Sequence, residues 1–139
     1  MNMSEELTDQ IINFFNGFSS WENSVIRASD VTVAEIHAIE ALGQCEKINM
    51  KSLAQKLGVT TGTVTVTVDR LEKKEYAHRE TTREDRRVNL ISLTEKGLKA
   101  SEEHHQYHLN LTEQILSVLS DDEARQLLHA LIKINAEIF

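Results

Sequence analysis

The chain has 139 residues, no proline, one cysteine, 40% hydrophobic residues and a formal net charge of −7 at pH 7. This length fits one domain, and the apolar content favours a globular over a disordered protein. The sequence has no apolar run near the roughly 18 residues of a membrane span, no signal-peptide start and no cysteine-rich zinc motif, so we expect a cytoplasmic protein without a membrane partner.

A long helix is predicted over residues 4–27, with Ser4 as its N-cap. Its apolar residues recur at alternating steps of three and four, the pattern of one helix face: Leu7, Ile11, Phe14, Phe18, Trp21 and Val25. Such a stripe fits either an ordinary core face or packing against a partner chain.

Three shorter helices should follow within residues 32–74. Thr32 and Glu35 form a capping box that opens a helix to about residue 44. Asn49 caps a helix over 50–57, which Gly58 ends, and Thr60 caps a helix that runs to about residue 74. In this last helix we expect Val64, Val68 and Leu71 to face inward and the threonines to face outward.

Two strands are predicted at 76–81 and 88–93, on either side of a charged turn. A long helix should begin near residues 94–97 and reach about residue 119. A second capping box at Ser120 opens a final helix. Its apolar residues again step by four and three: Leu127, Leu131, Ile134 and Ile138. The predicted fold is therefore mainly α with a small β-hairpin wing, in a single domain over residues 1–139.

The charge is concentrated in one part of the chain. Residues 47–99 carry twelve basic and seven acidic residues, a net charge of +5, while the remainder carries −12. The overall −7 argues against nucleic-acid binding, but the distribution reverses that argument for the central segment. This segment contains the helix-turn-helix and the hairpin, which together predict a winged helix-turn-helix.

The second helix of this motif and the hairpin tip carry the candidate DNA contacts. Small hydroxyl residues suit a helix that enters the major groove, and arginines suit the narrow minor groove. The same features also fit an exposed helix face and a solvated turn, but their coincidence in the basic segment favours DNA. The candidates are Thr60, Thr61, Gly62, Thr63, Thr65, Thr67, Arg70, Arg83, Arg86 and Arg87.

Three stretches resemble the MarR family of winged-helix regulators: Ser52–Val59, Val64–Lys74 and, most strongly, Asp85–Gly97, which is similar to the family's wing signature. The resemblance extends over nearly the whole chain, with a winged-helix module at 32–97 and dimerisation helices at 4–31 and 98–139. It implies a homodimer on a pseudo-palindromic double-stranded DNA operator, held together by the two stripes: Leu7, Ile11, Phe14, Phe18, Leu127, Leu131, Ile134 and Ile138.

The resemblance also implies roles for wing residues. It places Arg87 in the minor groove and gives Asp85 the role of orienting nearby basic groups. One departure is Glu75, where the family usually has glycine before the wing. If the backbone there keeps a positive φ, glutamate carries a strain that glycine would avoid.

Histidines cluster on the long helix after the wing. His104 and His108 are four residues apart and therefore share a face, a spacing that can chelate zinc. His37, with Glu22 or Glu103, could complete such a site. The alternative is a polar helix face or histidines that line a ligand pocket.

Two branches of the family resemble this region. The fatty-acid-synthesis repressors share the histidine pattern and the run Gly62–Thr65, and in them the effector is an acyl chain on acyl carrier protein. The zinc-dependent repressors of metal uptake share the second-helix histidine and the histidine-rich stretch. We favour the first branch and keep the zinc-responsive repressor as the alternative.

Other function classes fit less well. The sequence shows no phosphate-binding loop, nucleophile elbow or paired catalytic carboxylates, so we do not expect an enzyme. A dimeric interaction module that does not bind DNA remains an alternative from another class. Cys45 is expected to be a small buried residue rather than a peroxide sensor.

Overall fold

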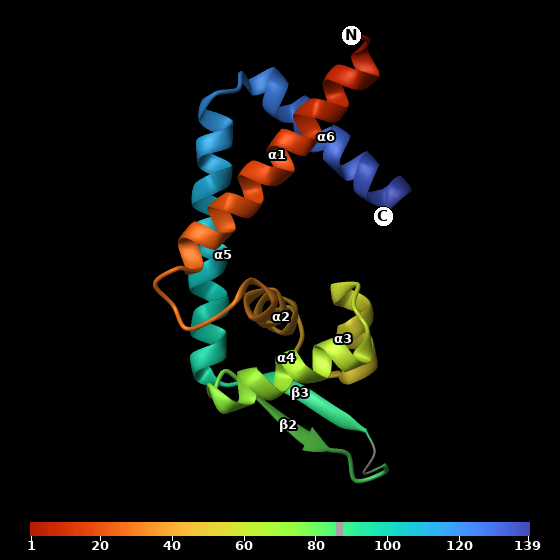
Figure 1. Ribbon diagram of the computed structural model, residues 1–139, viewed down its shortest axis with the longest axis vertical. Coiled ribbons are helices and arrows are strands. Elements are labelled where there is room, and N and C mark those ends of the chain that lie inside the picture. The colour runs from red at the N-terminus through yellow and green to blue at the C-terminus, as the bar shows by residue number, and fades with distance from the viewer. Residues whose placement is uncertain (86–87) are drawn as a thin grey trace. The chain divides into compact units, whose positions relative to one another are not determined.

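The elements follow one another in the order expected for a winged helix (Figure 1). They are α1 (Met3–Ile26), α2 (Val33–Gly43), β1 (Ile48–Asn49), α3 (Met50–Leu57), α4 (Thr61–Lys73), β2 (Ala77–Thr81), β3 (Asn89–Leu93), α5 (Glu95–Ser117) and α6 (Asp121–Ile138). This computed structural model describes residues 1–85 and 88–139 and comprises two units, Met1–His104 and His105–Phe139. The unit boundary lies within α5. The mainly α fold with a small wing is confirmed.

Most helix starts are those that the sequence predicts. Thr32, Asn49, Thr60 and Ser120 each accept a hydrogen bond from a backbone N–H three residues on. The exception is α1, which Asn2 caps instead of Ser4. The side chain of Asn2 accepts from the N–H of Glu5 at 3.0 Å, and the Glu5 carboxylate accepts from the N–H of Asn2 at 2.9 Å. Ser4 has Leu7 in the corresponding position, which cannot return that bond.

Helix α2 lies at the centre of the first unit. It is apolar on most of its circumference, with Ile36, Ile39 and Leu42 all at most 3% exposed, as expected for a helix that is covered on several sides. It contacts α1, α3, α4 and β3. The core around it also includes Leu53, Val64, Val68, Leu71 and Ile91.

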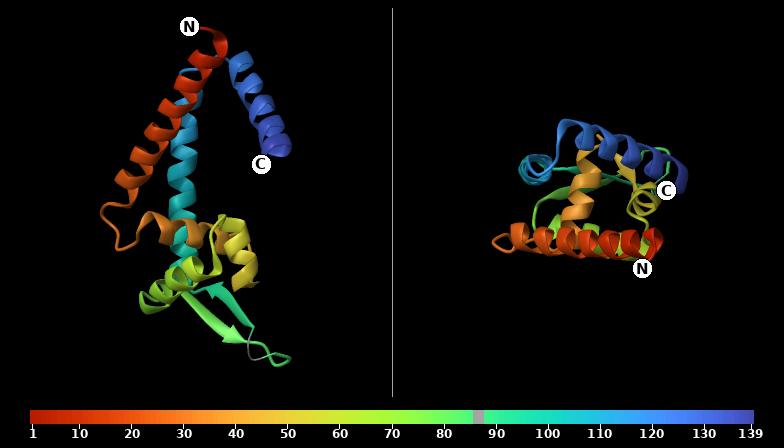
Figure 2. Two further views of the ribbon diagram at one scale, coloured as in Figure 1. Left: turned by 45° about the vertical axis from the view of Figure 1, so that its right-hand side comes forward. Right: turned by 90° about the horizontal axis from the view of Figure 1, so that it is seen from above.

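The wing is part of a three-stranded antiparallel sheet in the order β1-β3-β2. Strands β2 and β3 form the predicted hairpin (Figure 2). In its register Arg79 lies opposite Ile91. The third strand, β1, pairs Ile48 with Ile91 and was not predicted. A two-residue strand is too short to show alternation, so the sequence carries no signal for it.

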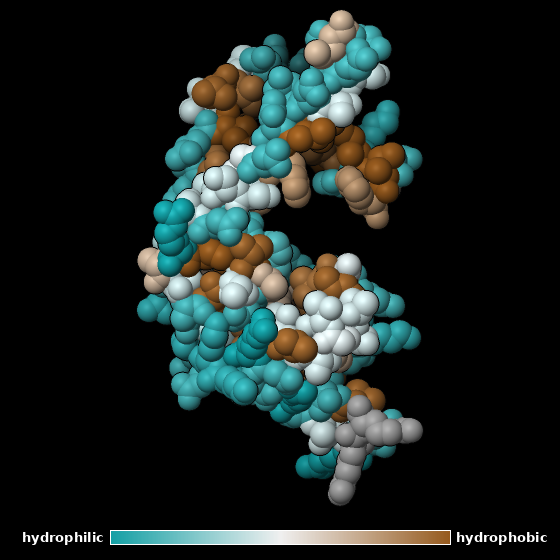
Figure 3. Space-filling model, in the orientation of Figure 1, coloured by the Kyte–Doolittle hydropathy of each residue, from teal (hydrophilic) through white to brown (hydrophobic). Residues whose placement is uncertain are grey.

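The second unit consists of the end of α5 and all of α6. No residue of α6 is buried. Figure 3 shows hydrophobic surface over this helix, where Leu127, Leu131, Ile134 and Ile138 are between 38% and 72% exposed. In the described parts of the chain, no helix is long and apolar enough to cross a bilayer.

Candidate nucleic-acid interface

Helices α3 and α4 form a helix-turn-helix joined by Gly58, Val59 and Thr60. Gly58 has φ +67°, a left-handed conformation that glycine adopts without steric cost. The N–H of Val59 then donates to the carbonyl of Ala54 at 3.0 Å, which closes the end of α3. The turn sets the direction in which α4 begins.

Helix α4 presents one buried and one exposed face. The predicted inner residues Val64, Val68 and Leu71 are completely buried. The exposed face carries Gly62, Val66, Lys73 and the adjacent pair Asp69 and Arg70, and its successive turns are three or four residues apart. Arg70 is therefore placed where the sequence predicts it, whereas Val66 and Lys73 were missed.

One predicted DNA contact on this helix is wrong. Thr67 is only 7% exposed, and its hydroxyl donates to the carbonyl of Thr63 at 3.1 Å. It lies between the buried Val64 and Val68 on the inner side, so it cannot reach a duplex. A threonine tolerates this position because the helix backbone satisfies its hydroxyl.

The remaining threonines lie at the start of α4. Thr61 and Thr63 are exposed, and Thr65 is half-buried. Thr60 accepts from the N–H of Thr63 at 3.2 Å, and the hydroxyl of Thr65 donates to the carbonyl of Thr61 at 2.7 Å. Thr60 therefore caps α4, and the hydroxyl protons of Thr60 and Thr65 are both donated within the protein, to the Thr63 hydroxyl and the Thr61 carbonyl.

The wing turn is organised by Thr82. Its hydroxyl donates to the Asp85 carbonyl at 2.7 Å and accepts from the Asp85 N–H at 2.9 Å. Arg83 lies exposed in this turn. Arg86 and Arg87, which the sequence predicts as minor-groove residues, lie outside the described residues.

An arginine joins the wing to α4. The guanidinium of Arg79 on β2 forms ion pairs with Asp69 and Glu72 on α4, and its Nε donates to Glu72 at 3.0 Å. The sequence pattern did not single out Arg79, because its partners lie seven and ten residues away on another element. This clamp limits how the hairpin can tilt relative to α4.

A second ion pair occupies one of the basic side chains of the segment. Lys47 pairs with Glu80 on β2, and this hydrogen bond lowers the pKa of Glu80 and raises the pKa of Lys47. Both groups therefore stay charged near neutrality. Lys47 is thus less available to a phosphate than its exposure suggests.

An open groove of about 540 Å³ runs between the helix-turn-helix and the start of β3, next to the wing turn. It is lined by Asn49, Met50, Lys51, Ser52, Gln55, Thr61, Val88 and Asn89. The N-terminus of α3 opens into it, and backbone N–H groups at a helix N-terminus favour an anion. Lys51 and Ser52 are consequently candidate phosphate contacts that the sequence argument did not identify.

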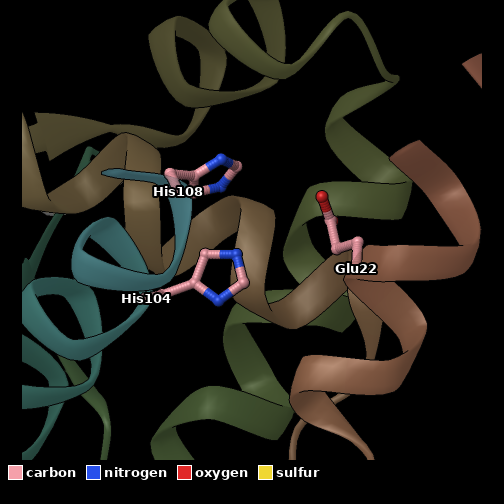
Figure 4. A group of neighbouring side chains, drawn as sticks. All are labelled: Glu22, His104 and His108. Carbon is pink, nitrogen blue, oxygen red and sulfur yellow. The ribbon is translucent and has the colours of Figure 1, made fainter. Parts of the chain in front are cut away.

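The predicted histidine site is partly assembled within the first unit. Glu22 on α1 forms an ion pair with His37 on α2, and the ligand atoms of Glu22 and His104 lie within 4.8 Å of each other (Figure 4). Both Glu22 and His104 are buried, and Nε2 of His104 lies 3.3 Å from Glu40. Glu103 is exposed beside the buried His104, so it does not join this group.

The predicted dimerisation residues of α1 divide into two groups. Leu7, Ile11 and Phe14 are 57–61% exposed. Phe18 is half-buried and its ring lies 5.3 Å from that of Trp21. The N-terminal half of this stripe is therefore available to a partner, while its C-terminal half packs within the first unit.

Comparisons with known proteins agree with this architecture. Residues 31–88 match the MarR family. The chain is 38% identical over 73 residues to the regulator SarZ of Staphylococcus haemolyticus, which is about half the length of each protein. It is 28% identical over 119 residues to the regulator MhqR of Bacillus subtilis, covering 84% of this chain and 82% of that protein.

A solved structure matches nearly the full length. The crystal structure of Streptococcus pneumoniae FabT in complex with DNA superimposes with a TM-score of 0.89 at 27% identity, covering 96% of this chain and 95% of FabT. The similarity thus includes the terminal helices as well as the winged helix.

Proposed function

We propose that the chain is a DNA-binding transcriptional regulator of the MarR family and that it represses its target genes as a homodimer on a pseudo-palindromic operator. Members of the family are regulators rather than enzymes. The observation that carries the proposal is the exposed face of α4 beside a basic wing, in a chain whose fold matches a protein solved on DNA.

The homodimer rests on the exposed apolar residues of the terminal helices. Leu7, Ile11 and Phe14 on α1 and Leu131 and Ile134 on α6 are each 46–61% exposed in the isolated chain. Faces of this kind are usually covered by a partner. Two copies would present two α4 helices to half-sites about one helical turn apart.

The resemblance to the fatty-acid-synthesis repressors supports a proposal for the regulated genes and the effector. We propose that the chain controls fatty-acid-synthesis genes in the cytoplasm and that an acyl chain on acyl carrier protein, or another effector, alters its affinity for the operator. An effector acts only through its different affinity for the DNA-competent and DNA-incompetent states.

A zinc-responsive repressor is the second candidate, favoured by the cluster around Glu22. Glu22, His37 and His104 come together within the first unit, and α5 places His108 one turn after His104. Imidazole and carboxylate groups are donors that Zn²⁺ accepts. When bound, the ion would be held within the first unit by Glu22 of α1 and His104 of α5.

Selection of duplexes from a random pool, followed by salt titration, tests the DNA-binding function. Arg70→Ala and Arg83→Ala should each weaken binding to the selected duplex by tenfold or more and reduce the slope of log K against log salt by about two, because a homodimer carries each arginine twice. Arg125→Ala, exposed on α6 outside the basic segment, is the matched control and should leave both unchanged. If neither Arg70→Ala nor Arg83→Ala changes the affinity for the duplex or the salt slope, the interaction module that does not bind DNA would be favoured.

The effector is tested with the same duplex in the presence of zinc, a chelator or acylated carrier protein. A zinc response that His104→Gln abolishes and His105→Gln preserves would support the metal-responsive candidate, because His105 is the exposed neighbour on the same helix. A response to the acylated carrier alone would support the lipid-responsive repressor.

A further inference from the structure

The exposed face of α4 carries one apolar side chain that the core does not use. Val66 is 50% exposed, whereas the neighbouring valines at 64 and 68 are completely buried. Helix α4 needs only these buried residues and Leu71 to pack on α2 and α3. The fold therefore gives no reason for a branched apolar residue at position 66.

Gly62 lies one turn before Val66 on the same face, and the fold does not require glycine there either. A Cβ at this position would meet no heavy atom nearer than the hydroxyl oxygen of Thr60, at 3.9 Å. Its backbone is helical, with no positive φ. Because glycine disfavours a helix by up to about 1 kcal/mol relative to alanine, the missing side chain costs stability without any benefit inside this chain.

The surroundings of these two residues fit the floor of a major groove. Thr65, beside Val66, turns its hydroxyl proton back to the carbonyl of Thr61. One turn further on, Asp69 is held by Arg79, while Arg70 is exposed. The first turns of α4 thus form a narrow surface with little charge. The exposed Arg70 at its border could contact a phosphate.

We infer that Val66 contacts the C5-methyl group of a thymine, and that Gly62 leaves the space that brings α4 close enough for this contact. The thymine methyl is the apolar group that base pairs present in the major groove. Val66 is then a specificity-determining residue for an A·T pair in each half-site. This inference rests on the proposed binding of double-stranded DNA and names the base that α4 recognises.

Replacing thymine by deoxyuridine removes only the methyl group and therefore tests the contact directly. In a duplex selected from a random pool, replacing one thymine in one half-site should weaken wild-type binding roughly three- to fivefold, the effect of one buried methyl group. Val66→Ala removes the contact in both half-sites, so it should weaken binding to the thymine duplex by about the square of this factor and should no longer respond to deoxyuridine at that position. Val59→Ala, a 42% exposed valine in the preceding turn, should keep the full response.

Gly62→Ala separates recognition from folding. The substitution should raise the thermal unfolding midpoint, because alanine favours the helix. It should nevertheless weaken binding to the selected duplex by tenfold or more, because the added methyl group occupies the space left for the bases.

The inference is overturned if the effects of Val66→Ala and deoxyuridine are independent at every thymine, or if Gly62→Ala binds as the wild type does. These results are distinct from a failure of the proposed function, in which the wild type would bind no duplex in a salt-dependent manner.

Discussion

At the scale of single residues, Glu75 shows how a local departure from glycine is accommodated. Its φ is +67°, the same value as that of Gly58 at the end of α3. The N–H of Glu75 donates to Glu72 and that of Tyr76 to Leu71, at 3.0 and 2.8 Å, which closes the end of α4. The strain that the sequence predicts at Glu75 for a positive φ is therefore present.

Glu75→Gly and Gly58→Ala should consequently change stability in opposite directions. Glu75→Gly should raise the free energy of unfolding by about 1 kcal/mol, because it removes the left-handed strain. Gly58→Ala should lower it by about the same amount, and purely through the backbone, since no atom lies within 4 Å of the added Cβ. Urea denaturation measures both free energies of unfolding. If the two substitutions changed this free energy in the same direction, the strain argument would be contradicted.

Tyr76, which lies between α4 and β2, makes a pH-dependent contact. Its hydroxyl donates to Asp30 at 2.5 Å, and burial, this hydrogen bond and the Asp30 charge raise the pKa of Tyr76 to about 12. The hydrogen bond to Tyr76 also lowers the pKa of Asp30. The folded state thus holds the phenol proton more tightly than the unfolded state does.

The stabilisation from Tyr76 should be complete below pH 10 and should be lost as the pH rises from 10 to about 12. Tyr76→Phe should be less stable than the wild type at pH 8, and the difference should shrink across this interval. Thermal unfolding at several pH values measures the effect. In a pH titration followed by phenolate absorbance, the transition near pH 12 should be present in the wild type and absent in Tyr76→Phe. A constant difference from pH 8 to 12 would exclude this linkage.

At the scale of elements, the start of α5 depends on a close approach to the end of α4. A Cβ on Gly97 would collide with the carbonyl oxygen of Tyr76 and approach Leu93 to 3.0 Å. Thr94 and Lys96 reinforce the contact by donating to the carbonyls of Glu75 and Lys74, at 2.6 and 2.7 Å. Gly97 is thus required by packing and not by its backbone conformation.

Gly97→Ala should therefore destabilise the first unit, by about 2–3 kcal/mol or more, because backbone atoms cannot move aside as a side chain can. Lys99→Ala, exposed on the same helix, is the matched control and should stay within about 0.5 kcal/mol of the wild type. The midpoint of thermal unfolding distinguishes the two. A Gly97→Ala variant as stable as the control would mean that α5 can shift.

At the scale of the whole molecule, the charge and the apolar surface occupy different parts of the chain. The basic segment 47–99 builds the helix-turn-helix and the wing, while the terminal helices carry acidic and exposed apolar residues. This separation fits a protein whose ends join two copies and whose centre meets DNA.

Leu131→Glu should convert the proposed homodimer to a monomer, because it places a charge in the apolar stripe of α6, where Leu131 is 47% exposed. The affinity of Leu131→Glu for the operator should also decrease, since a monomer binds only one half-site. Light scattering coupled to size exclusion measures the mass. Val118→Glu, 80% exposed between α5 and α6 and outside the stripe, should remain dimeric; a dimeric Leu131→Glu would place the interface elsewhere.

The sequence alone determined the helices, the hairpin and the inner face of α4. These depend on local signals, namely capping residues and apolar periodicity, which act within a few residues. It also placed the positive charge in the winged helix.

The tertiary structure decided which side chains meet. Thr67 is buried and so is no longer a candidate DNA contact, whereas Val66 is exposed. The rotation of α4 against α2 and α3 decides which of its small residues are buried. The tertiary structure also added β1 and the Arg79 clamp, whose partners are distant in sequence. Contacts of this kind carry no periodic signal along the chain and arise only when separate elements pack together.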